Sequence, residues 1–109
     1  MLAIAQSAVL AGIASHPVRV EVQATRGVPA FELVGLAEAA VRESRVRVKS
    51  ALAGVGVDIG EYRVTVNLAP ADVKKSGSAF DLAIALGTLV ALELLPPGTI
   101  EDVLLLGEL

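Results

Sequence analysis

The sequence predicts a two-layer α/β domain (α+β arrangement) with the element order β-β-β-α-β-α-β. Segments in which apolar and polar residues alternate, as in half-buried strands, occur beside two longer segments with the character of helices. Hydrophobic residues make up 54% of the 109 residues and aromatic residues only 3%, so the core must consist of Val, Leu, Ile and Ala. Such a core favours a sheet packed against helices.

Three strands are expected in the first third of the chain. The apolar run 2–11 is most simply a buried strand, and 12–17 is expected to form a turn. Residues 18–25 alternate Val or Ala with polar residues, which predicts a half-buried strand that pairs with the first as an antiparallel hairpin. A turn at 26–29 leads to a short third strand at 30–34.

The first helix is expected at residues 36–53, where the apolar residues recur with helical spacing. Charged residues line another face of this helix, and Glu43–Arg47 and Glu38–Arg42 are possible i,i+4 ion pairs. Gly54 is expected to end it. The predicted apolar face consists of Ala37, Val41, Val48, Ala51, Leu52 and Val55.

The last third of the chain predicts a strand, a helix and a final strand. Alternation returns at 62–68, which is the fourth strand. The segment 78–95 is apolar on almost every face and is expected to form the second helix, which Pro96-Pro97-Gly98 stops. A short apolar segment at 103–106 predicts the last strand.

Several classes of chemistry are excluded or weakly supported. The chain has no cysteine, so it has no disulfide, zinc–thiolate site or thiol nucleophile. His16 is the single histidine, and a turn residue is the simpler interpretation than a metal ligand. No phosphate-binding P-loop occurs, and Gly54-Val55-Gly56 lacks the third glycine of a dinucleotide fingerprint. We therefore expect no cofactor or metal in this chain.

The cellular setting is also constrained by composition. The formal net charge of −3 gives no whole-chain support for nucleic-acid binding. The first residues carry no Lys or Arg, so the positive region of a signal peptide is missing. Charged residues interrupt the longest apolar run, 79–95, so no transmembrane helix is expected. We expect a soluble, cytoplasmic domain without membrane contact.

The loop 69–81 is the main candidate for chemistry. Ser78 and Asp81 fit the S-x-x-D pattern of a helix capping box, which is a structural role. A second hypothesis makes Ser78 the nucleophile of a Ser–Lys dyad, although Lys74 and Lys75 are expected on an exposed loop where desolvation is difficult. A third has Lys74, Lys75 and the N–H groups of 77–79 grip an anion.

A second candidate is the basic face of the first helix, formed by Arg42, Arg45, Arg47 and Lys49. This face could contact nucleic acid or an acidic partner. Nearby acidic residues dilute its charge, so a solvated helix face is the simpler interpretation. Few aromatic residues are present to stack on bases, which argues against readout of single-stranded bases.

Three segments resemble the N-terminal domain of the ComM/YifB family, which is often labelled magnesium-chelatase-like or ChlI-like. They are VGLAEAAVRESRVRVKSAL at 34–52, VTVNLAPADVKKSGSAFDLAIAL at 64–86 and LLGEL at 105–109. The most specific part is N-L-A-P-A-D at 67–72, followed by Gly77 and Phe80-Asp81-Leu82. The resemblance implies that residues 1–109 are one domain of a longer protein with an AAA+ ATPase module. It also implies that ATP and magnesium bind outside this chain.

The resemblance further implies a hexameric DNA helicase that drives branch migration in natural transformation. The implied fold is similar to the proteolytic domain of Lon and the C-terminal domain of RadA. Aligning Lys75 and Gly77 with the serine-containing loop of Lon places the Lon serine at Ala79. Shifting this alignment by one residue places the serine at Ser78. The partner lysine would follow Gly107-Glu108, beyond the end of this chain.

We therefore expect a non-catalytic domain that contributes to oligomer assembly and could contact DNA. One alternative is a Ser–Lys peptidase that uses Ser78. Another is an interaction module without DNA contact, which would hold neighbouring subunits through an apolar edge near 103–106. The expected DNA-contacting residues are Arg42, Arg45, Arg47, Lys49, Lys74 and Lys75.

Overall fold

Two long strands form the largest pairing of the sheet. β1 (Leu2–Ala11) and β2 (Ala14–Arg26) pair antiparallel from Leu2↔Gln23 to Ala11↔Ala14 in the computed structural model. The structure describes residues 1–11 and 14–109. The expected hairpin is thus confirmed. The turn expected at 12–17 is wrong for residues 14–17, because pairing with β1 holds them in β2, whereas residues 12 and 13 lie outside the described part.

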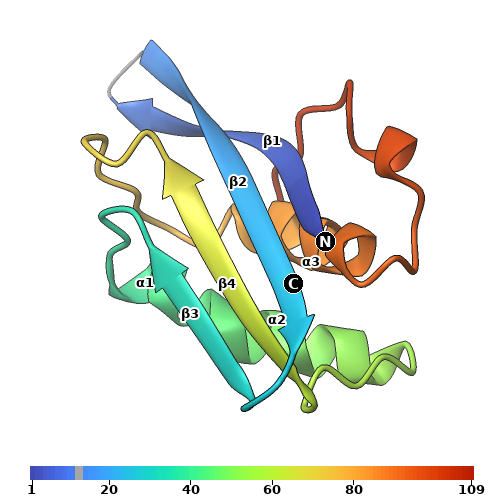
Figure 1. Ribbon diagram of the computed structural model, residues 1–109. Coiled ribbons are helices and arrows are strands. Elements are labelled where there is room, and N and C mark those ends of the chain that lie inside the picture. Colours follow the sequence, from blue (N-terminus) through green and yellow to red (C-terminus); the bar gives the residue numbers. More distant parts are fainter. Residues whose placement is uncertain (12–13) are drawn as a thin grey trace.

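Two shorter strands complete the sheet. β4 (Tyr62–Ala69) pairs antiparallel with β2, and β3 (Ala30–Val34) pairs parallel with β4. The strand order is β1-β2-β4-β3, so β3 lies at one edge of the sheet (Figure 1). The predicted third and fourth strands are confirmed, the fourth with one additional residue.

The helices lie together on one side of the sheet (Figure 1). α1 (Ala39–Arg42) and α2 (Ser44–Gly54) follow β3, and α3 (Asp81–Ala91) follows β4. α3 packs against β1 and β2, and α2 packs against α3 and β3. A short 3₁₀ helix, η1 (Pro97–Thr99), follows α3. The two-layer α/β prediction is confirmed.

Successive side chains of each strand point alternately toward the helices and toward the open face of the sheet. Val20 and Val22 of β2 and Val66 of β4 are fully buried, because they point into the helix layer. The intervening side chains lie on the other face, where Arg19 pairs with Glu21 at 3.1 Å. One face of the sheet is therefore apolar and covered, and the other is polar and open.

Two glycines allow close approaches within this sandwich. A Cβ at Gly87 would lie 2.8 Å from the Val22 side chain, so the absence of a side chain lets α3 sit directly on β2. Gly35 has φ +110°, and a Cβ there would lie 2.2 Å from the carbonyl oxygen of Leu68. Gly35 therefore fixes the end of β3 close to β4.

The first helix departs from the prediction at its start. Residues 36–38 are not helical, because they pair with the loop that follows β4. The Glu38 N–H donates to the Lys75 carbonyl, and the Lys75 N–H donates to the Leu36 carbonyl, each at 3.0 Å. Glu43 separates α1 from α2 but keeps helical dihedral angles (φ −68°, ψ −15°), so the two helices run on nearly continuously. The predicted apolar face is buried at Val41, Val48 and Leu52, whereas Val55 is exposed.

The second helix is shorter than expected, and the final strand is reduced to a bridge. α3 begins at Asp81 instead of residue 78 and ends at Ala91, two residues before Glu93, which has φ +62°. The segment expected as a strand at 103–106 pairs with β1 in an isolated bridge between Gln6 and Leu104, and the Ser7 hydroxyl donates to the Leu105 carbonyl at 2.8 Å. It then crosses to α3, where the Leu82 N–H donates to the Gly107 carbonyl at 3.0 Å.

Candidate functional site

A buried ionic cluster joins α2 to α3, and we call its three residues Ser44, Arg47 and Asp81 the buried junction. Asp81 is fully buried and accepts hydrogen bonds from the Ser44 hydroxyl, from Arg47 Nε at 2.6 Å and from Arg47 Nη2 at 3.1 Å. The Leu109 N–H donates to the same carboxylate at 3.1 Å, and Arg47 also donates to the Ala40 carbonyl at 2.8 Å. The buried junction therefore holds two helices and the segment at 109 together.

The buried junction keeps both of its charges. Burial opposes ionisation of Asp81, but hydrogen bonds from Arg47, Ser44 and Leu109 outweigh it, and the pKa of Asp81 is lowered. The hydrogen bond to Asp81 raises the pKa of Arg47. Arg47 is one of the predicted DNA-contacting residues, but its guanidinium is already engaged by protein acceptors, namely the Asp81 carboxylate and the Ala40 carbonyl.

Lys75 is also placed differently from the expectation of an exposed loop residue. Its side chain is fully buried, and its ammonium group donates to the Pro70 carbonyl. Burial lowers the pKa of Lys75, and the negative charge of Asp72 partly opposes this shift. Lys75 is therefore a structural residue of its loop, and the predicted roles in anion or DNA contact do not fit its position. Its exposed neighbour Lys74 pairs with Glu38 at 3.0 Å.

The predicted capping box at the start of α3 does not form. The N-cap position belongs to Phe80, and no side chain caps the helix. Ser78 contributes only its carbonyl, which accepts from the Asp81 N–H at 3.2 Å. The Asp81 side chain turns to the buried junction because Arg47 and Ser44 offer charged and polar partners there. In the described part of the chain the Ser78 hydroxyl has no hydrogen-bond partner, and the Lys75 ammonium bonds elsewhere.

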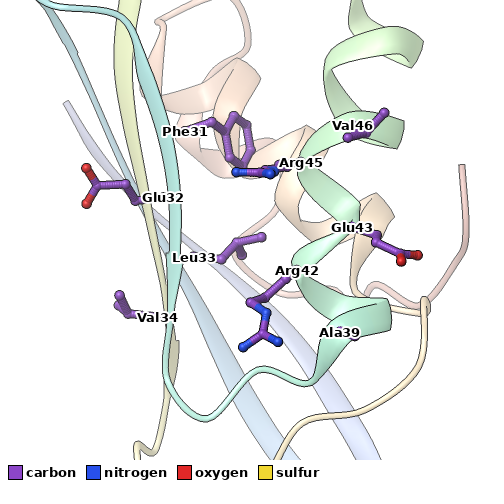
Figure 2. A pocket seen from close by; sticks show the side chains of 9 residues that line it. All are labelled: Phe31, Glu32, Leu33, Val34, Ala39, Arg42, Glu43, Arg45 and Val46. Carbon is purple, nitrogen blue, oxygen red and sulfur yellow. The ribbon is translucent and has the colours of Figure 1, made fainter.

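The other charged side of α1 and α2 opens onto a groove beside the edge strand β3. We call it the β3 groove, with a volume of about 550 Å³. In Figure 2 Phe31 and Leu33 point from β3 toward the helices, and Arg42 and Arg45 lie between the strand and the helices. Val46 lies on the helix side. The β3 groove thus has an apolar floor and a cationic wall.

The acidic residues at the β3 groove point away from it. Figure 2 shows Glu32 on the far side of β3 and Glu43 on the far side of the helices. Glu32 pairs with Arg63 at 2.8 Å, and Glu43 lies 3.8 Å from Arg47. Their charges are therefore engaged outside the groove and only weakly offset its cations.

Further hollows continue the β3 groove at both ends. One runs along α2 past Lys49, and the other runs past Leu36 toward Lys74. Of the six predicted contact residues, the structure brings Arg42 and Arg45 to the β3 groove, Lys49 to the hollow at one end and Lys74 to the hollow at the other. The sequence analysis did not identify Phe31 and Leu33 as the apolar floor of this groove. Their alternation with Glu32 and Val34 was the available signal.

The described residues contain neither a membrane-spanning helix nor a cluster of metal ligands. No helix among residues 1–11 and 14–109 is long and apolar enough to span a membrane. Within the same residues, no three His, Asp or Glu side chains gather as metal ligands. His16 is exposed and lies in β2, not in the turn expected from its neighbour Pro17.

The sequence matches known proteins along most of its length. The family model for subunit ChlI of Mg-chelatase matches residues 20–109. The uncharacterized protein YifB of Escherichia coli strain K12 is 39% identical over 108 residues, which cover 99% of this chain and 21% of that protein. Competence protein ComM of Haemophilus influenzae is 42% identical over 108 residues, which again cover 99% of this chain and 21% of that protein. The chain thus spans about a fifth of the length of these relatives, and it belongs to the ChlI family, with YifB and ComM among its relatives.

Proposed function

We propose that this chain is a non-catalytic accessory domain of a ComM-like AAA+ ATPase that acts on DNA in natural transformation and recombination. The similarity to competence protein ComM supports this assignment. Because the chain covers only 21% of that protein, it corresponds to one part of a longer protein. In the proposal ATP and magnesium are bound by other parts of the longer protein. The domain acts in the cytoplasm and contributes contacts to a hexamer.

The observation that supports the non-catalytic role is the set of hydrogen bonds formed by the side chains of the loop 69–81. Neither lysine of the loop bonds to Ser78, because the Lys75 ammonium donates to the Pro70 carbonyl and Lys74 pairs with Glu38. Asp81, at the end of the loop, is occupied by the buried junction. The loop therefore supports the packing of α3 and has no assembled acid–base pair.

Protein contact is favoured over DNA contact as the role of the exposed surface. Two of the six candidate contacts already serve the protein itself: Lys75 is fully buried, and the guanidinium of Arg47 is held by Asp81. The cations that stay exposed line a groove with an apolar floor, and the net charge of the chain is −3. A DNA surface would need more phosphate contacts than these for tight binding at physiological salt.

The test uses the longer protein that carries this chain. Its oligomer mass is measured by mass photometry, with ATP and magnesium, in the intact protein and after deletion of residues 1–109. We expect deletion to shift the hexamer toward smaller species while the ATPase activity of the remainder persists. An unchanged hexamer would remove the assembly role.

The peptidase alternative is tested with a serine-reactive fluorophosphonate probe on the same longer protein. We expect equal labelling of the native protein and the Ser78→Ala variant. Labelling that disappears in Ser78→Ala would show that this hydroxyl is an activated nucleophile, and the non-catalytic proposal would then be wrong.

A further inference from the structure

We propose that the β3 groove binds an extended peptide with acidic side chains at alternate positions, which adds a strand to the edge of the sheet beside β3. This inference rests on the proposed function as a protein-contact domain and names the chemistry of the partner. It depends on three properties of the site: a free strand edge, a groove of matching length and a row of cations.

The free edge comes from the order of the sheet. β3 pairs with β4 on one side, and in the described residues no backbone hydrogen bond or bridge reaches 30–34 from the other side. An edge strand presents the N–H and C=O groups of alternate residues to whatever lies beside it. An extended peptide satisfies these groups by forming one more ladder, which is the basis of β-augmentation.

The dimensions of the groove favour an extended occupant. β3 contains five residues, which span about 16 Å at a rise of about 3.3 Å per residue. The hollows follow this length from Lys49 at one end to Lys74 at the other. The site is thus elongated along the strand, and a peptide of about five residues covers it.

The cations lie at matching intervals on the helix side. Arg42, Arg45 and Lys49 follow i, i+3, i+7 spacing, which places them on one helix face over about 10 Å. All three are exposed, and none forms an ion pair within the described residues. In an added strand, side chains that point the same way recur about every 6.6 Å. Two acidic residues of the peptide therefore fit this row of cations.

The two faces of the added strand need different side chains. On the helix side, carboxylates meet Arg42 and Arg45, and their apolar stems pack on Phe31 and Leu33. On the open side, the intervening residues lie next to Glu32 and Val34 (Figure 2). Acidic residues there would repel Glu32. The groove therefore selects alternating acidic and non-acidic residues.

A peptide fits these properties better than a nucleic-acid strand or a second copy of the chain. DNA cannot form a ladder with the β3 backbone, and Phe31 is the single aromatic side chain along the groove floor. Antiparallel pairing of two β3 strands centred on Glu32 would place two like charges opposite each other, which destabilises a sheet.

The binding test uses a fluorescein-labelled, end-capped hexapeptide in which Val and Glu alternate, and measures anisotropy with the 109-residue chain. A block peptide, with three Val followed by three Glu, controls for net charge. We expect the alternating peptide to bind about tenfold more tightly than the block peptide, with amide NMR shifts in 30–34. Equal affinity of the two peptides would overturn the proposal.

Two further comparisons test the cationic wall of the groove and the backbone hydrogen bonds of the peptide. The double variant Arg42→Glu/Arg45→Glu should weaken binding at least about tenfold, whereas Arg19→Glu on the open face should leave it within about twofold. Thermal unfolding confirms that each variant is folded. N-methylation of the peptide at one alternate set of amides should abolish binding, and methylation at the other set should not. Equal affinities for the two methylated peptides would rule out strand addition.

Other occupants give distinct results. Competition by a single-stranded oligonucleotide that is lost in Arg42→Glu/Arg45→Glu would assign the groove to nucleic acid and overturn the peptide proposal. A dimer of the chain that dissociates in the same variant would assign the groove to a second copy. Failure of the peptide to bind, with the deletion of residues 1–109 still disrupting the hexamer, would reject the groove inference and leave the proposed function intact.

Discussion

Arg45 and Arg47 lie two positions apart on α2 but occupy opposite environments. Arg47 points into the molecule and is held by Asp81 at 2.6 Å, whereas Arg45 points out into the β3 groove. Two positions on an α-helix differ by about 200° in direction, which accounts for the separation. Basic residues of one helix therefore contribute to two sites, the buried junction, which is closed, and the β3 groove, which is open.

The two sites differ in what their charges contribute. Removing one partner of a buried ion pair costs about 3–5 kcal/mol, because the other charge stays buried without compensation. An exposed cation contributes about 0–1 kcal/mol to stability. The buried junction is therefore expected to determine folding, and the β3 groove is expected to determine binding.

Asp81→Ala should be the most damaging change to the closed site. It leaves the Arg47 guanidinium and the Ser44 hydroxyl without their main acceptor. We expect a loss of about 3–5 kcal/mol in the free energy of unfolding, measured by urea denaturation. Ser78→Ala in the same loop is the matched control and should change stability by less than about 0.5 kcal/mol. A loss from Asp81→Ala as small as that of the control would contradict the structural role of the buried junction.

Gly35→Ala should distort the open site without altering its cations. The new Cβ meets the Leu68 carbonyl at 2.2 Å, and the residue has φ +110°, so the end of β3 must move away from β4. We expect a loss of about 2–3 kcal/mol from strain and overpacking. Gly77→Ala has φ +82° but no atom within 4 Å of the new Cβ, and it should cost only about 1 kcal/mol. Equal losses in thermal unfolding would show that the contact with Leu68 is unimportant.

Acid should weaken the buried junction. Hydrogen bonds lower the pKa of Asp81 in the folded state below its unfolded value of about 3.9. The stabilisation from Asp81 is complete above the unfolded pKa and is lost as the pH falls through the folded pKa. Urea midpoints of the native chain should therefore fall more steeply in acid than those of Asp81→Asn. Parallel pH profiles would contradict the assignment.

Alkali should have a smaller effect in the opposite sense at Lys75. Burial lowers the pKa of Lys75, so the folded state disfavours its proton, and stability should rise as the pH passes from the folded pKa toward the unfolded value of about 10.4. Lys75→Met removes this rise, whereas Lys74→Met, in an exposed neighbour, keeps it. Urea denaturation of the three proteins between neutral and alkaline pH measures the difference. A rise of the same size in Lys75→Met would place its origin at another group.

The strands were predictable because their sequence pattern and their burial have the same cause. Val18, Val20 and Val22 alternate with polar residues since one face of β2 meets the helices and the other is open. The start of the first helix was not predictable in this way. Pairing of residues 36–38 with Lys75 overrides local helical periodicity, and the two segments are far apart in the sequence.

The candidate sites show the same limit. Ser78 and Asp81 fit a local capping pattern, but Asp81 is recruited by Arg47, which lies 34 positions away. Helical periodicity could separate Arg45 from Arg47, but only the packing of α2 on α3 reveals which of the two is buried. The β3 groove required a further long-range fact, namely that β3 lies at the edge of the sheet.

The smallest stability effect is expected at Arg45, and it separates the two sites most sharply. Arg45→Gln should change the free energy of unfolding by less than about 0.5 kcal/mol, because its guanidinium forms no ion pair within residues 1–11 and 14–109. Arg47→Gln, two positions along the same helix, leaves Asp81 buried without its cation and should cost about 3 kcal/mol or more. Anisotropy with the alternating Val–Glu peptide should show the reverse order at Arg45, where binding weakens although folding does not. Comparable losses of stability in the two variants would mean that the outward and inward faces of α2 are not energetically distinct.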